Sequence, residues 1–271
     1  MSVQNIQLLV IDPQHDFCNP NGSLFVPGAV EDMDRLALMV SRLSKKLDDI
    51  HITMDSHHLF DIAHPAYWVD SNGKNPSPFT IIQASDVKNG SWQPAVPSLF
   101  NRSLAYLEAL KSSGRYDLCI WPVHCRIGTE GHTIVPKLMD AVSDWEMSPG
   151  IADIVTKGSN PYTEHYSAVQ AEVPDPQDQT TQLNTDLIKA LMKADQIAIA
   201  GEASSHCVCN TVRDIADNFG DDSYIKKLVY LKDASSFVPL PGDAGKKMEE
   251  SFLRDLTARG MKISTTTEWL A

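Results

Sequence analysis

The chain lacks the features that mark nucleic-acid-binding, membrane and secreted proteins. Basic residues are scarce: 23 Lys and Arg stand against 35 Asp and Glu, and the formal net charge of −12 repels nucleic acids and anionic membranes. No apolar run approaches the roughly 20 residues of a membrane span. The first residues show neither the basic region nor the long apolar stretch of a signal peptide. We therefore expect a cytoplasmic protein without a nucleic-acid or membrane partner.

Cysteine is scarce as well. The 271 residues contain five cysteines, an odd number, and no Cys-x-x-Cys pair. A chain of this length can bury a full core and needs no disulfides to stabilise it. The pattern therefore argues against a disulfide framework and against a thiolate zinc site.

Short apolar runs alternate with helical patterns along the chain. The runs end in polar residues or glycine, and they are Leu8–Asp12, Ile50–Asp55, Ile151–Lys157, Gln196–Gly201, Leu228–Leu231 and Met261–Ser264. Between most of them, apolar residues recur at helical spacing. Continuously apolar strands that alternate with amphipathic helices indicate an α/β fold, in which a parallel sheet is covered on both faces. In such a sheet, ligands bind beyond the carboxyl ends of the strands.

One region breaks this alternation. From Pro65 to about Leu99 the chain is rich in Pro, Gly, Ser and Asn, and its periodicity is weak. A structureless loop of this length is unusual in a compact domain and is typical of lids and binding loops. We therefore predict a single domain over residues 1–271, with a loop-rich insertion at about residues 65–120 that lies over the ligand pocket.

Cys207 is the candidate nucleophile. It follows the apolar run that ends at Gly201, at the point where a helical pattern begins. At the N-terminus of a helix, unpaired backbone N–H groups and the helix dipole favour a thiolate, which is a nucleophile. Asp12 and Lys157 each close another apolar run. An aspartate beside the thiol could take its proton, and a lysine there would lower its pKa.

A second group of residues suits a metal ion. Asp55-Ser56-His57 places a carboxylate and an imidazole on one side of an extended segment, because residues two apart share a face there. Mixed Asp and His ligation suits Zn²⁺, Mn²⁺ or Fe²⁺. A third ligand is needed, and His124 and His64 are both candidates. The residues thus predict a divalent metal site and leave its third ligand open.

Together these residues resemble the nicotinamidase and isochorismatase-like cysteine hydrolases. The stretches that carry the likeness are Val10–Phe17, Asp55–His57, Trp121–Thr129 with Lys157-Gly158, Gly201–Cys207 and the shorter Thr163–Ser167. The Trp-Pro-x-His-Cys pattern is more similar to the nicotinamidase branch than to the isochorismatase branch, which lacks the metal site. The likeness runs from the first strand to the last, although not through the insertion.

The resemblance implies a fold and a catalytic centre. The family fold is a six-stranded parallel sheet between helices, which makes a three-layer α/β sandwich. The implied catalytic triad is Asp12, Lys157 and Cys207. The backbone N–H groups of Ala203 and Cys207 would form the oxyanion hole, and relatives have a cis peptide bond at the position of Glu202–Ala203.

The resemblance also implies a cofactor and a substrate pocket. The metal, Zn²⁺ first with Mn²⁺ or Fe²⁺ as alternatives, would be held by Asp55, His57 and His124. Ser56 departs from the family, which commonly has an aromatic residue there, so a ring that could stack on the substrate is missing. The candidates for the substrate pocket are Phe17, Trp68 and Tyr166, with Trp92 as another possible ring from the insertion.

The expected activity is hydrolysis of a small amide to the acid and ammonia through a thioester on Cys207. Nicotinamide is the first candidate substrate, and another small amide, such as a carbamoyl or ureide compound, is the alternative. A non-catalytic member of the family is disfavoured, because the residues of the implied triad are all present. Relatives are commonly oligomeric, so the resemblance also implies a homo-oligomer.

Overall fold

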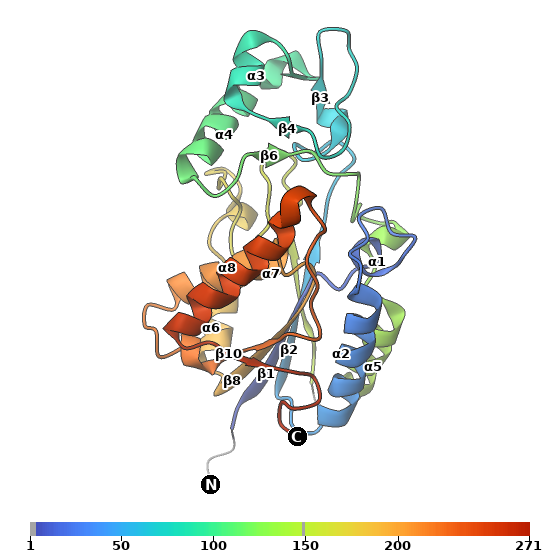
Figure 1. The fold of residues 1–271 in the computed structure, drawn as a ribbon, viewed down its shortest axis with the longest axis vertical. Helices are drawn as coiled ribbons and strands as arrows, with labels where there is room; N and C mark the ends of the chain where they lie inside the picture. The colour runs from blue at the N-terminus through green and yellow to red at the C-terminus, as the bar shows by residue number, and fades with distance from the viewer. Residues whose placement is uncertain (1–3, 148–149) are drawn as a thin grey trace.

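The computed structural model describes residues 4–147 and 150–271. Its centre is a six-stranded sheet in which all neighbouring strands are parallel, in the order β10-β9-β8-β1-β2-β7 (Figure 1). The strands are β1 (Ile6–Ile11), β2 (Asp49–Asp55), β7 (Asp153–Lys157), β8 (Gln196–Gly201), β9 (Leu228–Leu231) and β10 (Lys262–Ser264). Each coincides with one of the six apolar runs, so the predicted parallel sheet is confirmed.

Helices cover both faces of this sheet (Figure 1). On one face lie α2 (Ala29–Leu43) and α5 (Pro136–Glu146), whose apolar residues join one core cluster with β1 and β2. On the other lie α6 (Thr185–Met192), α7 (Cys207–Asn218) and α8 (Ala244–Arg259), which form a second cluster. Every residue of β1 is buried, because it is a central strand that is packed on both sides. The three-layer α/β sandwich is therefore present as predicted.

The strand order places the candidate site. The chain order of the strands reverses between β1 and β8, which are neighbours in the sheet, and a crevice opens beyond the strand ends at such a reversal. Gly201 closes β8 there with a φ of +114°, and a Cβ on it would lie 2.0 Å from the carbonyl oxygen of Ile11. Only glycine allows this close approach of the two strand ends.

The insertion has its own structure, which the weak periodicity did not reveal. Its elements are β3 (Trp68–Val69), β4 (Ile81–Ile82), α3 (Ala84–Asn89), β5 (Gln93–Pro94), α4 (Phe100–Ser113) and β6 (Leu118–Cys119), with short 3-10 turns at Pro65–Tyr67 and Pro97–Leu99. They enclose a third apolar cluster that includes Tyr67, Trp68 and Leu107. The loop-rich insertion is therefore folded: loops join short strands and turns, and α4 adds a helix of 14 residues. The apolar residues of these elements pack across the insertion.

The remaining elements are short. They are α1 (His15–Cys18) and 3-10 turns at Glu130–His132, Gln179–Thr181, Ile225–Lys227 and Pro241–Asp243. Within the two described ranges, the helices are all too short or too polar to cross a membrane.

Candidate active site

The three residues of the predicted triad meet at the carboxyl edge of the sheet. Asp12 directly follows β1, Lys157 ends β7, and Cys207 is the first residue of α7. The Nζ atom of Lys157 lies 3.0 Å from Oδ2 of Asp12 and 3.6 Å from Sγ of Cys207. All three side chains are buried. The structure thus brings together Asp12 and Cys207, which are 195 positions apart in the chain (207 − 12).

The backbone holds Asp12 in an unusual conformation. Its φ is +46°, in the left-handed region that non-glycine residues rarely adopt and that is enriched at functional sites. Thr53 on β2 stabilises it twice: its carbonyl accepts the backbone N–H of Asp12 at 3.1 Å, and its hydroxyl donates to Oδ1 at 2.5 Å. The other carboxylate oxygen is left to face Lys157.

Burial and charge set the protonation of the triad. Burial raises the pKa of Asp12, and the charge of Lys157 offsets this only in part. Burial alone would lower the pKa of Lys157, but Asp12 and Asp55 outweigh it and raise that pKa well above its ordinary value. For Cys207, burial raises the thiol pKa, Lys157 opposes it, and Asp12 raises it further. The expectation of a resting thiolate is therefore not supported, and the thiol needs a base to become a nucleophile.

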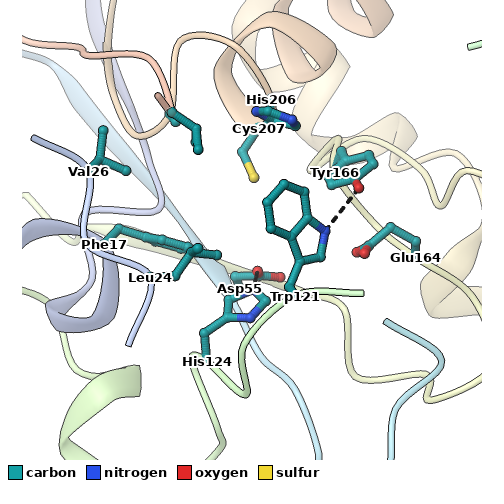
Figure 2. Close-up of a pocket in the computed structure, with 12 residues that line it drawn as sticks. Phe17, Leu24, Val26, Asp55, Trp121, His124, Glu164, Tyr166, His206 and Cys207 are labelled. Carbon is teal, nitrogen blue, oxygen red and sulfur yellow. Dashed lines mark hydrogen bonds and ion pairs between the residues drawn. The ribbon is translucent and has the colours of Figure 1, made fainter. Parts of the chain in front are cut away.

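Cys207 opens into a small cavity (Figure 2). Its walls are mostly apolar and aromatic, and its lining residues are Phe17, Leu24, Val26, Asp55, Trp121, His124, Glu164, Tyr166, Ala203, His206, Cys207 and Val238. Two of the predicted pocket residues, Phe17 and Tyr166, are among them. The indole N–H of Trp121 donates to the hydroxyl of Tyr166 at 3.0 Å and so fixes both rings in the wall. Such a site suits a small, flat, largely apolar molecule.

Trp68 is not part of this cavity, which corrects the prediction. It is fully buried in the core of the insertion, where its indole N–H donates to the carbonyl of Ile62 at 2.8 Å. The tryptophan that lines the cavity is Trp121, at the start of the Trp-Pro-x-His-Cys stretch. None of the residues from Pro65 to Leu118 lines the cavity itself, although Phe79 of the insertion packs against Trp121 in its wall, with ring centroids 5.8 Å apart.

Ser56 also has a different role from the one expected. Its hydroxyl lies 2.8 Å from Nε2 of His132 and donates to the carbonyl of Met54, and it is not among the cavity residues. Ser56 therefore packs beside the cavity and does not form part of its wall.

The strand-to-helix turn before Cys207 has the form that the resemblance implies. The Glu202–Ala203 peptide bond is cis. Ala203 lines the same cavity as Cys207, and its carbonyl accepts the N–H of Val208 at 3.1 Å. This turn places two residues with candidate oxyanion-hole N–H groups around one space.

The predicted metal ligands gather beside the triad. Oδ2 of Asp55 lies 3.1 Å from Nε2 of His57 and 3.3 Å from Nε2 of His124. Both candidates for the further ligand are present: Nε2 of His64 lies 3.2 Å from Nδ1 of His124, and the three histidines form a buried cluster whose candidate ligand atoms all lie within 4.8 Å of one another. Ligands bound tetrahedrally to zinc at about 2.0–2.1 Å lie roughly 3.4 Å apart. The two distances from Oδ2 of Asp55 to Nε2 of His57 and of His124 fit such an ion.

The outer nitrogens of the three imidazoles support this interpretation. Nδ1 of His57 lies 2.9 Å from a carboxylate oxygen of Asp61. Nδ1 of His64 lies 3.0 Å from the carbonyl oxygen of His58, and Nδ1 of His124 lies 2.8 Å from that of Pro122. Metal-binding histidines almost always donate their second N–H in this way, which turns the other nitrogen inward. The donor set therefore fits a divalent metal, with Asp55, His57, His64 and His124 around it.

The candidate metal site and the triad share one contact. Nζ of Lys157 donates to Oδ1 of Asp55 at 2.9 Å and to the carbonyl of His165 at 2.9 Å. One lysine thus lies between the carboxylate of the base and the carboxylate of the metal site. Two further buried acids were missed from the sequence: Asp61, four residues after His57, and Glu164, in the stretch before Tyr166. Glu164 lies inside the family-like stretch Thr163–Ser167, which could have indicated it, whereas no motif in the sequence marks Asp61.

Comparisons with known proteins agree with this architecture. No model of a known protein family matches the chain. The nicotinamidase of Saccharomyces cerevisiae is 26% identical over 212 residues, which cover 78% of this chain and 81% of the relative. The solved structure of the yeast nicotinamidase matches 95% of this chain and 98% of its own, with a TM-score of 0.64 and 21% identity. A Pyrococcus horikoshii pyrazinamidase in complex with zinc matches 96% of this chain and 99% of its own, with a TM-score of 0.56 and 22% identity.

The chain therefore has the fold of the solved nicotinamidases, and its sequence is similar to that of a yeast nicotinamidase over most of both chains.

Proposed function

We propose that the protein is a cysteine amidohydrolase that converts a small amide, nicotinamide first, to the acid and ammonia. The observation that carries the proposal is the buried contact of Asp12, Lys157 and Cys207 at the wall of a largely apolar cavity. A nucleophile, a base and a cation in one enclosed space form the constellation that acyl transfer requires. The likeness to nicotinamidases supports this substrate class.

The first half of the reaction forms a thioester. Asp12 accepts the proton of the Cys207 thiol, and Sγ attacks the carbonyl carbon of the amide. The N–H groups of Ala203 and Cys207 stabilise the oxyanion, a contribution of about 3–4 kcal/mol per donor. As the C–N bond breaks, Asp12 returns its proton to the departing nitrogen, so that ammonia leaves. Lys157 compensates the charges on Asp12 and the sulfur throughout.

The second half releases the acid. A water molecule gives its proton to Asp12 and attacks the thioester carbonyl, and the C–S bond breaks. The proton then returns from Asp12 to the sulfur and restores the thiol. The raised pKa of Asp12 suits both directions of this transfer, because a base works best when its pKa lies near the operating pH.

We further propose that the protein holds a divalent metal, with Zn²⁺ first and Mn²⁺ or Fe²⁺ as alternatives. Asp55, His57 and His124 would hold it, and His64 is placed to contribute as well. When bound, such an ion supplies a Lewis acid for a lone pair of the substrate, such as that of a pyridine nitrogen, and so orients the ring. Asp55 and His124 both line the cavity, which supports this role.

A second candidate substrate class is another small amide, such as a carbamoyl or ureide compound. A larger apolar cavity of about 590 Å³ adjoins the catalytic one and shares Trp121, Tyr166 and His206 with it. Phe79 and Ile81 of the insertion line this second cavity. Its volume and its apolar wall favour amides that are larger than nicotinamide.

Ammonia release from a panel of amides tests the proposal. The panel contains nicotinamide, pyrazinamide, ring-substituted nicotinamides and a ureide, and each is measured with wild type, Cys207→Ala and chelated enzyme. Release by wild type and none by Cys207→Ala is the expected result. Release from other amides but not from nicotinamide would establish the second candidate. The amidase proposal fails if wild type releases ammonia from none of them.

The expected homo-oligomer and the cytoplasmic location stay predictions. Light scattering of the purified protein decides the first, because a mass equal to that of one chain would contradict it. Fractionation of the source cells decides the second.

A further inference from the structure

A buried carboxyl group lies directly beside the turn that carries the proposed oxyanion hole. Glu202 is fully buried, and its backbone precedes Ala203. Nothing in the proposed reaction uses this side chain. A carboxyl group is costly to bury, and it persists in a protein interior only where it is neutral, paired or hydrogen-bonded. Glu202 therefore requires an explanation of its own.

Glu202 bonds to a second segment that supports the turn. We call Gly201–His206 the turn and Ala234–Val238 the strap. The backbone N–H of Ser236 donates to Oε2 of Glu202 at 3.1 Å, and the N–H of Val238 donates to the hydroxyl of Ser205 at 3.1 Å. Two backbone bonds, from Gly201 to Ala234 and from Ser204 to Ser236, complete the contact. The strap is thus tied to the turn over its whole length, and its end, Val238, lines the cavity.

The same carboxyl group meets a second acid, Asp32 on α2. The hydroxyl of Ser236 donates to Oδ2 of Asp32 at 2.5 Å, and Arg35 donates to Oδ1 at 2.6 Å. Ser236 thus contacts both acids, and Oε1 of Glu202 has no hydrogen-bond partner among the described residues. Two neighbouring buried carboxyl groups repel each other when both are ionised, so one of them keeps its proton. Asp32 is paired with Arg35, so the proton belongs on Glu202.

The charges around Glu202 favour this neutral form. Burial raises the pKa of Glu202 well above its ordinary value, and Asp32 and, more weakly, Glu249 raise it further. The titratable and charged groups that face it are Asp32 and Arg35 from α2, Cys18 from α1, Tyr230 from β9 and Glu249 from α8. Arg35 is the single cation in this set, and it already contacts Asp32. An ionised Glu202 would add an unpaired negative charge beside Asp32.

We propose that Glu202 is a positioning residue whose neutral carboxyl group joins the turn to the strap and to α2, and so holds the N–H groups of Ala203 and Cys207 in place for the oxyanion. This inference rests on the proposed amidase function. It assigns to Glu202 no contact with the substrate. Loss of its proton repels Asp32 and loosens the turn, so it reduces transition-state binding more than substrate binding.

Kinetics over a range of pH test this role. The variants are Glu202→Gln, which keeps a neutral hydrogen-bonding group, Glu202→Ala, which removes it, and Glu249→Gln as a control for a nearby acid that does not contact the turn. Glu202→Ala should lower kcat on the order of 10- to 100-fold with KM little changed, since the loss of a whole oxyanion donor costs 10²–10³-fold. Glu202→Gln should restore kcat at neutral pH.

The pH profile adds a readout that a purely structural role would not move. Because the carboxyl group of Glu202 must stay protonated, wild type should lose kcat as the pH rises through its folded-state pKa. Glu202→Gln cannot ionise, so its alkaline limb should extend to higher pH, whereas Glu249→Gln should follow wild type. Superimposable profiles of wild type and Glu202→Gln would overturn the inference.

An aldehyde analogue distinguishes an effect on oxyanion binding from an effect on binding of the pyridine ring. Pyridine-3-carboxaldehyde adds to the thiol as a hemithioacetal whose oxygen lies at the oxyanion hole, whereas nicotinate binds without that bond. Glu202→Ala should weaken binding of the aldehyde and leave the affinity for nicotinate unchanged. Equal weakening of both affinities would contradict a positioning role. If Glu202→Ala does not fold, the pH profile of Glu202→Gln decides. A wild type that turns over no amide would defeat the proposed function itself, whereas unchanged kinetics of Glu202→Ala would defeat this inference alone.

Discussion

Lys157 connects the two halves of the candidate site, because one ammonium group contacts the candidate base, the candidate nucleophile and a carboxylate of the candidate metal site. Asp12 and Asp55 both lie within about 3 Å of Nζ, at 3.0 and 2.9 Å. Burial is the main reason that the pKa of the Cys207 thiol is raised; Lys157 opposes this, and the charges of Asp12 and Asp55 raise the pKa further. In the proposed reaction, the nucleophile therefore forms when Asp12 takes the thiol proton.

Removal of Lys157 should destabilise the fold as well as abolish activity. Lys157→Ala leaves Asp12 and Asp55 buried without their cation, and a buried pair broken in this way costs about 3–5 kcal/mol of unfolding free energy. Urea denaturation measures the change. The matched control is Lys189→Ala, because Lys189 is exposed and forms its ion pair among the described residues with the exposed Asp186 at 3.7 Å, so stability should hardly change there. Equal stability of the two variants would show that Lys157 does not compensate the carboxylates.

The pKa of Asp12 predicts the acid limb of the activity. Asp12 must be ionised to accept the thiol proton, and burial raises its pKa. As the pH decreases, activity should therefore be lost at a pH that is higher than the ordinary pKa of an aspartate. The pH profile of kcat/KM for an amide substrate measures this limb. Activity that persists down to the ordinary pKa of an aspartate would contradict the raised pKa.

The end of β2 and the loop that follows it supply most of the candidate metal site. Asp55 ends β2, whereas His57, Asp61 and His64 lie on the loop, and His124 comes from elsewhere in the chain. Asp61 is buried, accepts the N–H of Ala63 at 3.0 Å with one oxygen and faces Nδ1 of His57 with the other. It thereby sets the ring orientation of a candidate ligand.

Metal content should follow this arrangement. His57→Ala and His124→Ala should purify without the metal, whereas Asp61→Asn should bind it about 10- to 100-fold more weakly, since loss of an outer hydrogen bond typically has that effect. Elemental analysis and competition with a chelator measure both. His58→Ala, on the same loop with an exposed ring, should keep wild-type affinity. If His124→Ala retains the metal and His64→Ala loses it, His64 is the required ligand.

The insertion has an apolar core of its own, which contains Trp68. Substitution of Trp68 should affect stability, whereas substitution of Trp121 should affect activity. Trp68→Ala should cost about 3–5 kcal/mol of stability, because a fully buried tryptophan leaves a large void, and kcat/KM of the folded enzyme should stay close to wild type. Trp121→Ala should reduce kcat/KM instead, because Trp121 lines the cavity. Thermal denaturation and amide kinetics of both variants measure the two effects, and a strong kinetic defect in stable Trp68→Ala would place that ring near the substrate after all.

The whole molecule follows a general rule of parallel sheets. Strands β1 and β8 meet at the reversal of strand order, and Asp12 and Cys207 lie just past their ends. Lys157 and Asp55 end the neighbouring strands β7 and β2, which pair at these residues. Four polar residues from four strand ends therefore converge in one crevice without any local contact in the sequence.

The sequence by itself determined the six strands of the sheet, because continuous apolar runs are local patterns. The family resemblance predicted the triad, and the fold brings its three side chains together. Tertiary structure alone decided which aromatic residue lines the cavity. Trp68 and Trp121 are both apolar and near family-like motifs, and only packing buries one in the insertion and places the other beside Cys207. The contacts of Asp61 and Glu202 also depend on it, since a carboxyl group has a function only through the donors that the fold brings to it. Local patterns specify elements, whereas long-range packing selects the partners of each polar side chain.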